Sequence, residues 1–316
     1  MHLLKNRKTA DEQDLKERYL NMLGFIGLGI MGRPMTKNLL KAGVEVLAAD
    51  LNKDAVADVV AAGAKEASYA EIGEKCDVII TMVPNGAIVQ SILFGEGGVA
   101  STIKAGTVVC DMSSVTATES KQCYEKLKEM GVGFLDAPVS GGEPGAVAGT
   151  LAIMCGGDKK DFETMKPYFD ILGSSALLVG PSGAGSTTKL ANQMIVNNTI
   201  AVVSEAFVFA AKAGADPAKV YEAIRGGLAG SAVLDAKIPM ILDRNFVPGG
   251  PIRINHKDIK NCVASAHAID APIPYTAQLY EIMQSMKVHG MMNLDHGSIV
   301  QYFEQLAGCE VKKIEE

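Results

Sequence analysis

The chain has 316 residues, of which 48% are hydrophobic, 21% charged and 5% aromatic. A net charge of −6 excludes a general nucleic-acid binder, because such proteins need a basic face to replace the counterions of phosphate groups. The length predicts about two domains. Six cysteines without a C-x-x-C pair and five histidines without an H-E-x-x-H motif predict reduced core thiols, a cytoplasmic protein and no metal site.

The first 21 residues are charged and lack the apolar core of a secretory signal. A strand pattern begins at Met22, directly after this segment. Residues 1–21 are therefore predicted to be an N-terminal extension that contributes nothing to the active site.

Apolar runs alternate with helical patterns over residues 22–182. Strands are expected at 22–29, 44–50, 77–83, 106–112, 133–139, 150–157 and 176–180, and helices at about 30–43, 53–62, 86–93 and 116–130. Alternation of this kind, with strands that are apolar throughout, predicts an α/β domain: a mostly parallel, doubly wound sheet covered by helices on both faces.

The alternation stops after Gly180, and residues 183–316 are predicted to form an all-α domain. Helices are expected at 185–213, 217–225, 231–243, 256–269, 273–288 and 295–307. Asp216-Pro217 supplies an N-cap and a first-turn proline for the second of them. The first helix is long enough to span a membrane, but its Asn, Gln, Ser and Thr residues argue against that.

The segment Gly27-Leu28-Gly29-Ile30-Met31-Gly32 matches G-x-G-x-x-G between an expected strand and an expected helix. In that context the glycines permit a tight turn, close approach to a pyrophosphate and helix–strand packing, and the helix N-terminus faces the phosphates. The motif predicts a dinucleotide site in a Rossmann-type domain, although a glycine-rich turn without a ligand would have the same sequence.

Asp50 ends the second strand, where a carboxylate accepts hydrogen bonds from a ribose diol and repels a 2′-phosphate. The following residues contain no Arg, so NAD is expected rather than NADP. The alternative is that Asp50 only caps a turn.

Two further strand ends carry candidate ligands. Ser113 and Ser114 contact cofactor or substrate on one interpretation and cap the next helix on the other. Ser140-Gly141-Gly142 offers a hydroxyl and approachable glycine amides for an anion, although a plain turn is the alternative.

Lys189 follows Gly185 and Ser186 and is expected in the first turn of the long helix, where the helix dipole disfavours a cation. A lysine in such a place needs a compensating anion or a lowered pKa. Asn192 and Gln193, three and four positions on, share its helix face. The alternative is a surface lysine at a helix end.

Five segments together resemble the β-hydroxyacid dehydrogenase family: GFIGLGIMGRPM, DMSSVTA, DAPVSGGEPGA, GAGSTTKLANQ and HKD at 256–258. The resemblance covers nearly everything from residue 22 onward. It implies a Rossmann domain, a long interdomain helix and a helical domain that forms a homodimer or homotetramer. It also implies hydride transfer between a nicotinamide cofactor and a small anionic aldehyde or hydroxy acid.

The resemblance also assigns roles to single residues. Lys189 matches the family's catalytic lysine, which acts as general acid and base. The other matches are substrate-binding Ser140, Gly141, Gly142 and Asn192; Lys257 and Asp258, a pair from the helical domain that closes over the cleft; and Pro84, Asn85, Ser114 and Lys257 for the cofactor.

Segments 223–237 and 243–249 most resemble members that reduce tartronate semialdehyde to D-glycerate. Sister activities on 3-hydroxyisobutyrate, 2-(hydroxymethyl)glutarate or sulfolactaldehyde are the alternatives. Gly250-Pro251 departs from the aromatic-basic pair that is frequent in the family, which leaves the substrate open. Lys189 argues against imine reductases and against non-catalytic relatives, because both usually lack that lysine.

Overall fold

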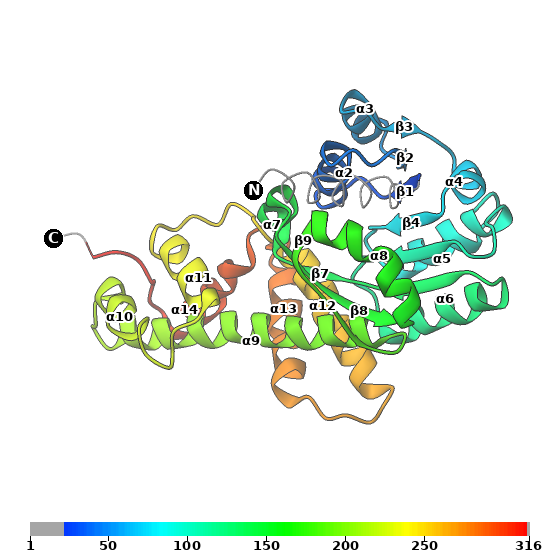
Figure 1. Ribbon diagram of the computed structural model, residues 1–316. Helices are drawn as coiled ribbons and strands as arrows, with labels where there is room; N and C mark the ends of the chain where they lie inside the picture. Colours follow the sequence, from blue (N-terminus) through cyan, green and yellow to red (C-terminus); the bar gives the residue numbers. More distant parts are fainter. Residues whose placement is uncertain (1–21, 315–316) are drawn as a thin grey trace, which may run out of the picture. The chain divides into compact units, whose positions relative to one another are not determined.

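The computed structural model describes residues 22–314, which divide into two compact units between Lys189 and Leu190 (Figure 1). The predicted N-terminal extension lies outside the described residues. The division falls inside the long helix, seven residues beyond the boundary expected at 182. Each unit has its own hydrophobic clusters.

The first unit is built on a sheet of nine strands, counted over the described residues. The spatial order is β3-β2-β1-β4-β5-β6-β8-β7, with β9 paired to β8. The strands are β1 (Leu23–Ile26), β2 (Val46–Ala49), β3 (Lys65–Glu66), β4 (Val78–Thr81), β5 (Val108–Asp111), β6 (Gly133–Asp136), β7 (Val139–Ser140), β8 (Leu151–Gly157) and β9 (Gly173–Gly180). Pairing is parallel from β3 through β6 and antiparallel where β8 meets β6 and β7.

Helices cover both faces of this sheet. They are α2 (Gly32–Lys41), α3 (Lys53–Ala61), α4 (Tyr69–Lys75), α5 (Gly86–Phe94), α6 (Ala117–Glu129), α7 (Gly142–Ala148) and α8 (Lys159–Leu172), with a 3-10 turn, η1 (Val99–Ser101). Neighbouring residues of one strand belong to hydrophobic clusters on opposite faces of the sheet. Ile80 packs with α2 and α8, and Ile79 packs with α4, α5 and α6. The prediction of a doubly wound, mostly parallel sheet is thus confirmed.

Several elements of this unit differ from the sequence-based expectation. The apolar run expected as one strand at 133–139 is divided into β6 and β7, and the short helices α4 and α7 were not expected. α8 was missed as well, because Pro167 lies inside it and proline normally interrupts a helix. Burial of Met165, Phe169 and Leu172 against the sheet outweighs that local preference.

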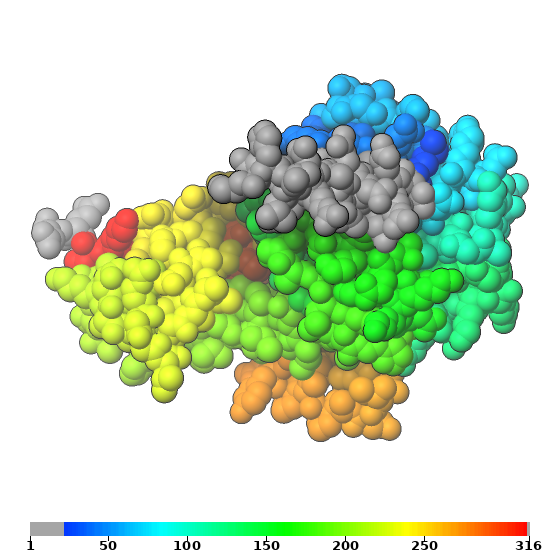
Figure 2. Space-filling view, viewed as in Figure 1, coloured from blue at the N-terminus to red at the C-terminus, as the bar shows by residue number. Residues whose placement is uncertain are grey.

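The second unit is helical. Its elements are α9 (Ala184–Lys212), which begins in the first unit, α10 (Pro217–Ile224), α11 (Ala232–Leu242), α12 (Ile252–His267), α13 (Pro274–Val288), the 3-10 turn η2 (His296–Ile299) and α14 (Val300–Ala307). Asp216 caps α10 by accepting from Ala218 N, with Pro217 in the first turn, as expected. Figure 2 shows α10 and α11 (yellow-green to yellow) packed side by side, and Tyr221 and Leu234 share a cluster there.

α9 has the length and hydropathy of a helix that could cross a membrane: an 18-residue window averages 1.6, with 39% of it buried within this chain. Its buried polar residues include Gln193, Asn197 and Ser204, and a core helix satisfies the same test of length and hydropathy. The six cysteines, all within the described residues, are unpaired thiols, and five are buried, as expected.

Candidate functional site

The carboxyl ends of five parallel strands lie in register at one edge of the sheet. The aligned terminal residues are Ile26, Ala49, Thr81, Asp111 and Asp136. The predicted cofactor and carboxylate segments all follow these strand ends in the sequence. Open α/β sheets bind their ligands beyond this edge, so the topology gathers the candidate residues of the first unit there.

The glycine-rich loop fits a pyrophosphate. Gly27 has φ +100°, and a Cβ there would collide with the carbonyl oxygen of Met82. A Cβ at Gly32 would collide with the Gly27 carbonyl, whereas nothing lies within 4 Å of a Cβ built at Gly29. α2 begins at Gly32, and no side chain of the described residues caps it at Met31. The tight turn, the open approach and the uncapped helix end are what an anionic dinucleotide needs.

Asp50 lies beside this loop with both carboxylate oxygens engaged. Leu28 N donates to Oδ2 at 2.5 Å and Asn52 N donates to Oδ1 at 2.7 Å. The interpretation of Asp50 as a turn cap is therefore correct, and it is compatible with a ribose contact because a carboxylate has further lone pairs. Lys53, the nearest cation in sequence, is paired with Glu66 at 2.6 Å.

Asn85 is the N-cap of α5, four residues after the end of β4. Its side chain accepts from Ile88 N at 3.0 Å and so caps the helix. A Cβ at Gly86 would collide with the carboxylate of Glu119, so this turn packs tightly on α6. The cap uses Oδ1 of Asn85, and Nδ2 takes no part in it.

Asp111 organises the next strand end. Its Oδ1 accepts from Thr81 Oγ1 at 2.8 Å and from Ser113 N at 3.1 Å, and Ser113 Oγ accepts from Val83 N at 2.9 Å. Burial raises the pKa of Asp111 to about 6, although these hydrogen bonds act in the opposite direction. Ser113 is fully buried, whereas Ser114 is partly accessible. The alternative interpretation, that these serines cap the next helix, is wrong, because Thr116 caps α6 in a capping box with Glu119.

Ser140, Gly141 and Gly142 form the turn between β7 and α7. Gly141 and Gly142 have φ of +135° and +60°, conformations that side chains other than glycine rarely adopt. Both glycines are exposed and Ser140 is partly buried. Two consecutive glycines of this kind, next to a hydroxyl, present backbone N–H groups to an anion.

Lys189 is the sixth residue of α9, which begins at Ala184. The expectation that it lies in the first turn is therefore wrong, because the helix begins before Gly185. The side chain is buried, with 8% of its surface exposed. The helix dipole falls off within the first turn, so its effect on Lys189 is smaller than the sequence suggested.

A carboxylate does occupy the start of α9. Asp136, at the end of β6, accepts from Gly183 N and Ser186 N, each at 2.7 Å. Burial raises the pKa of Asp136 to about 6, against these hydrogen bonds. A compensating anion was one of the two expected features near Lys189, but local sequence does not single out Asp136, because it lies 50 residues away from Ser186 in the chain.

In the helical unit, four predicted residues form one polar cluster. Gln193 Nε2 donates to Asp258 Oδ2 at 2.6 Å, and Asn192 Nδ2 donates to Gln193 Oε1 at 3.0 Å. Lys257 Nζ lies 3.1 Å from Asp258 Oδ1. Gln193 and Asp258 are buried. The bridge between α9 and α12 joins the motifs GAGSTTKLANQ and HKD, which sequence alone does not connect.

The segment that contains the Gly250-Pro251 departure is held by Asp295. Gly249 N and Gly250 N donate to Asp295 Oδ2 at 3.0 and 3.1 Å, and Lys237 Nζ donates to Oδ1 at 2.8 Å. Burial opposes ionisation of Asp295, but the hydrogen bonds from Lys237 and a backbone N–H hold its pKa below the usual value. Asp295 was not among the predicted residues.

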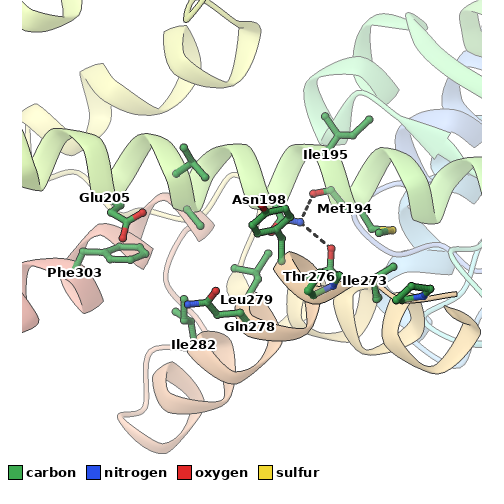
Figure 3. A pocket seen from close by; sticks show the side chains of 15 residues that line it. Met194, Ile195, Asn198, Glu205, Ile273, Thr276, Gln278, Leu279, Ile282 and Phe303 are labelled. Carbon is green, nitrogen blue, oxygen red and sulfur yellow. Dashed lines mark hydrogen bonds between the residues drawn. The ribbon is translucent and has the colours of Figure 1, made fainter. Parts of the chain in front are cut away.

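An apolar groove of about 780 Å³ lies in the helical unit (Figure 3). α9 and α13 supply most of its lining, including Met194, Ile195, Leu279 and Ile282. None of the predicted site residues lines it. Within residues 22–314, no group of three or more His, Cys, Asp or Glu side chains is arranged for a metal ion.

Two family models match this chain in succession. The NAD binding domain of 6-phosphogluconate dehydrogenase matches residues 22–180, and the NAD-binding model of NADP-dependent 3-hydroxyisobutyrate dehydrogenase matches residues 183–303. The chain belongs to the β-hydroxyacid dehydrogenase family. As a member of this family it is an oxidoreductase that uses a nicotinamide cofactor.

Characterised members of the β-hydroxyacid dehydrogenase family align with almost the whole described chain. The 2-hydroxy-3-oxopropionate reductase of Escherichia coli is 43% identical over 287 residues, 90% of this chain and 98% of that protein. The 2-(hydroxymethyl)glutarate dehydrogenase of Eubacterium barkeri is 37% identical, over 92% of this chain and 97% of that protein. A Mycobacterium tuberculosis 3-hydroxyisobutyrate dehydrogenase structure with L-serine superposes with a TM-score of 0.84 at 28% identity, covering 90% and 99% of the two chains.

Proposed function

We propose that the protein catalyses NADH-dependent reduction of tartronate semialdehyde (2-hydroxy-3-oxopropionate) to D-glycerate. The observation that carries this proposal is the 43% identity to the E. coli 2-hydroxy-3-oxopropionate reductase over 98% of that enzyme. The segments 223–237 and 243–249, which most resemble such reductases in sequence, lie in the helical unit.

The proposed chemistry assigns one task to each candidate group. The nicotinamide cofactor, when bound, supplies the hydride to the aldehyde carbon or accepts it from the alcohol. Lys189 donates a proton from its ammonium group to the aldehyde oxygen during reduction and takes one from the hydroxyl during oxidation. Ser140 and the amides of Gly141 and Gly142 bind the substrate carboxylate, as their conformation and exposure permit.

The remaining predicted residues are proposed as further ligands. Asn192, Lys257 and Asp258 bind substrate, and Lys257 also contacts the cofactor. Pro84, Asn85 and Ser114 contact the nicotinamide side of the dinucleotide. The support for the first three is that they form one polar cluster. Gln193 joins the amide of Asn192 to the carboxylate of Asp258, and Lys257 pairs with Asp258.

The proposal for the cofactor is NAD rather than NADP. Asp50 has a carboxylate at the strand end where the adenosine ribose binds, and like charge disfavours a 2′-phosphate. The neighbouring Lys53 is engaged by Glu66, which leaves it poorly placed to offset that repulsion.

We also propose a cytoplasmic homodimer or homotetramer that buries one face of α9. Ile195, Val202 and Phe209 lie seven residues apart and are 70%, 62% and 75% exposed. Their spacing places them on one stripe of the helix. Ile195 and Val202 also line the apolar groove of Figure 3. An exposed apolar face of this kind can bury itself against the same face of a second copy under a two-fold axis, which makes a second copy the proposed partner.

A second candidate activity is the oxidation of 2-(hydroxymethyl)glutarate, favoured by the 37% identity to the Eubacterium barkeri enzyme. A panel of tartronate semialdehyde, 2-(hydroxymethyl)glutarate, 3-hydroxyisobutyrate and sulfolactaldehyde, assayed in the matching direction with both cofactors, decides between them. We expect the highest kcat/KM for tartronate semialdehyde with NADH. A higher value for any other substrate would overturn the assignment.

A further inference from the structure

Asp136 connects two of the motifs that the sequence carries. It begins the segment DAPVSGG, which ends in the carboxylate-binding turn, and it caps α9, which carries Lys189. Both of its oxygens are used: Gly183 N donates to Oδ1 and Ser186 N donates to Oδ2, each at 2.7 Å. Asp136 is 0% exposed, so these contacts take place without competing solvent.

The surroundings leave the carboxylate and the helix end little room to move. A Cβ at Gly156 would lie 2.7 Å from Asp136 Oδ1 and 2.6 Å from Gly185 N. A Cβ at Gly185 would collide with the carbonyl oxygens of Asp136 and Met154. The first turn of α9 therefore packs directly on the backbone of β6 and β8, an approach that only glycine allows.

A second hydrogen bond joins the first turn of α9 to helix α6. Ser186 Oγ lies 2.9 Å from Ser120 Oγ on α6, and both serines are buried. Lys189 follows Ser186 by three residues, so it lies on the same face of the helix one turn later. Any shift of the anchored turn would therefore be transmitted to the lysine by the rigid helix.

We propose that Asp136 is a positioning residue for Lys189: by anchoring the first turn of α9 to the end of β6, it fixes where the amine is presented. The proposal rests on the role of Lys189 given above as general acid and base. Asp136 also places a carboxylate at the positive end of the helix, so it orients α9 and offsets the field that opposes a cation near its start.

The test is a double-mutant cycle between Asp136→Asn and Lys189→Ala, measured as single-turnover hydride transfer with NADH and tartronate semialdehyde. An asparagine retains one acceptor but turns an N–H group toward one of the two backbone donors. A misplacement of about 1 Å can cost about 10²-fold in rate, so we expect Asp136→Asn to slow the wild-type reaction by about 10- to 100-fold. In the Lys189→Ala background the same change should cost less than about threefold, because the residue it acts through is gone.

Asp111→Asn is the matched control. Asp111 is the register partner of Asp136 on β5 and equally buried, but it accepts hydrogen bonds from Thr81 and Ser113. Asp111→Asn should change the rate of hydride transfer by the same factor in the wild type and in Lys189→Ala. Ser186→Ala is a milder variant that enters the same cycle if Asp136→Asn does not fold.

The stability of the first turn of α9 can also be measured directly, without an activity assay. Amide hydrogen exchange in a peptide covering residues 183–189 should quicken in Asp136→Asn and stay unchanged in Asp111→Asn. Equal rate losses in both backgrounds, or no loss in the wild type, would overturn the positioning role. Near-full turnover by Lys189→Ala alone would instead overturn the proposed mechanism, so the two failures are distinguishable.

Discussion

Leu28 N donates to a carboxylate oxygen of Asp50 across the ends of β1 and β2. The residue expected to bind the ribose therefore also holds the loop expected to bind the pyrophosphate. Replacement of Asp50 then has two separable effects, one on charge and one on the shape of the loop, and two substitutions can distinguish them.

Asp50→Asn removes the charge and retains an acceptor for Leu28 N. We expect wild type to favour NADH over NADPH by ~10-fold or more in kcat/KM, since a factor of ten corresponds to about 1.4 kcal/mol. Asp50→Asn should reduce that preference, mainly by improving NADPH. Asp50→Ala should also weaken NADH binding, because Leu28 N loses its partner. Asp54→Asn, at an exposed carboxylate in α3, is the control. Equal or better use of NADPH by wild type would contradict the assignment.

Lys189→Met retains most of the aliphatic side chain and removes the ionisable group. It should lower kcat by about 10²–10⁴, the range for loss of a general acid and base. NADH affinity should be almost unchanged, because the proposed cofactor site, Gly27 to Gly32 and Asp50, does not include Lys189. Lys189→Arg should not restore the rate, since a guanidinium does not give up its proton. Single-turnover transfer and NADH titration measure both quantities, and a Lys189→Met enzyme with normal kcat would exclude the lysine from catalysis.

Stability gives a further comparison at this position. Lys189 is buried and one turn inside α9, so Lys189→Ala removes packing by the aliphatic side chain and relieves little repulsion from the dipole. Lys189→Met should therefore be more stable than Lys189→Ala. The reverse order in chemical denaturation would indicate that the charge dominates.

Local sequence patterns predicted those strands and helix ends that depend on neighbouring residues alone. Apolar runs predicted the central strands, and Asp216-Pro217 predicted the start of α10. They failed where distant contacts decide: α8 forms in spite of Pro167 because its apolar face packs on the sheet. α9 begins before Gly185 because Asp136, far away in sequence, satisfies the first N–H groups of the helix.

In the candidate site too, some residues have a signal in the local sequence and others depend on distant contacts. The glycine motif, Asp50, Ser140 and Lys189 could be proposed as candidates from residue type and position in the pattern. The roles of Asp136, Asp111 and Asp295 could not, because each acts as an acceptor for backbone N–H groups whose positions are known only after folding. Buried acceptors of this kind give no local signal beyond an acidic residue in an apolar run.

The exposed stripe of α9 predicts the oligomeric state. Val202→Glu places a charge in the middle of the proposed interface and should produce monomers at micromolar concentration, since a buried unpaired charge is strongly unfavourable. Sedimentation velocity measures this directly. Leu177→Glu, at a residue of β9 with 66% of its surface exposed, is the control and should leave the assembly intact. A Val202→Glu protein of unchanged mass would exclude this face.

Asp136 also makes a testable contribution to the pH dependence of stability. Its pKa is raised from 3.8 to about 6, so the folded protein binds this proton more tightly than the unfolded chain does. The contribution is fully present below pH 3.8 and is lost as the pH rises through about 6. Asp111 contributes with the same sign. Buried His296, with its pKa lowered to about 4, contributes with the opposite sign between pH 6.5 and 4.

Comparison of Asp136→Asn with wild type isolates one of these three groups. As the pH rises from 4 to 7, the wild type loses the contribution of Asp136 and the variant has none to lose. The unfolding free energy of the variant relative to wild type should therefore increase with pH, by at most about 3 kcal/mol, because each unit of pKa shift corresponds to about 1.4 kcal/mol. Urea denaturation at several pH values measures this difference. A difference that is constant over the range, or that decreases with pH, would show that Asp136 is ionised in the fold without a raised pKa.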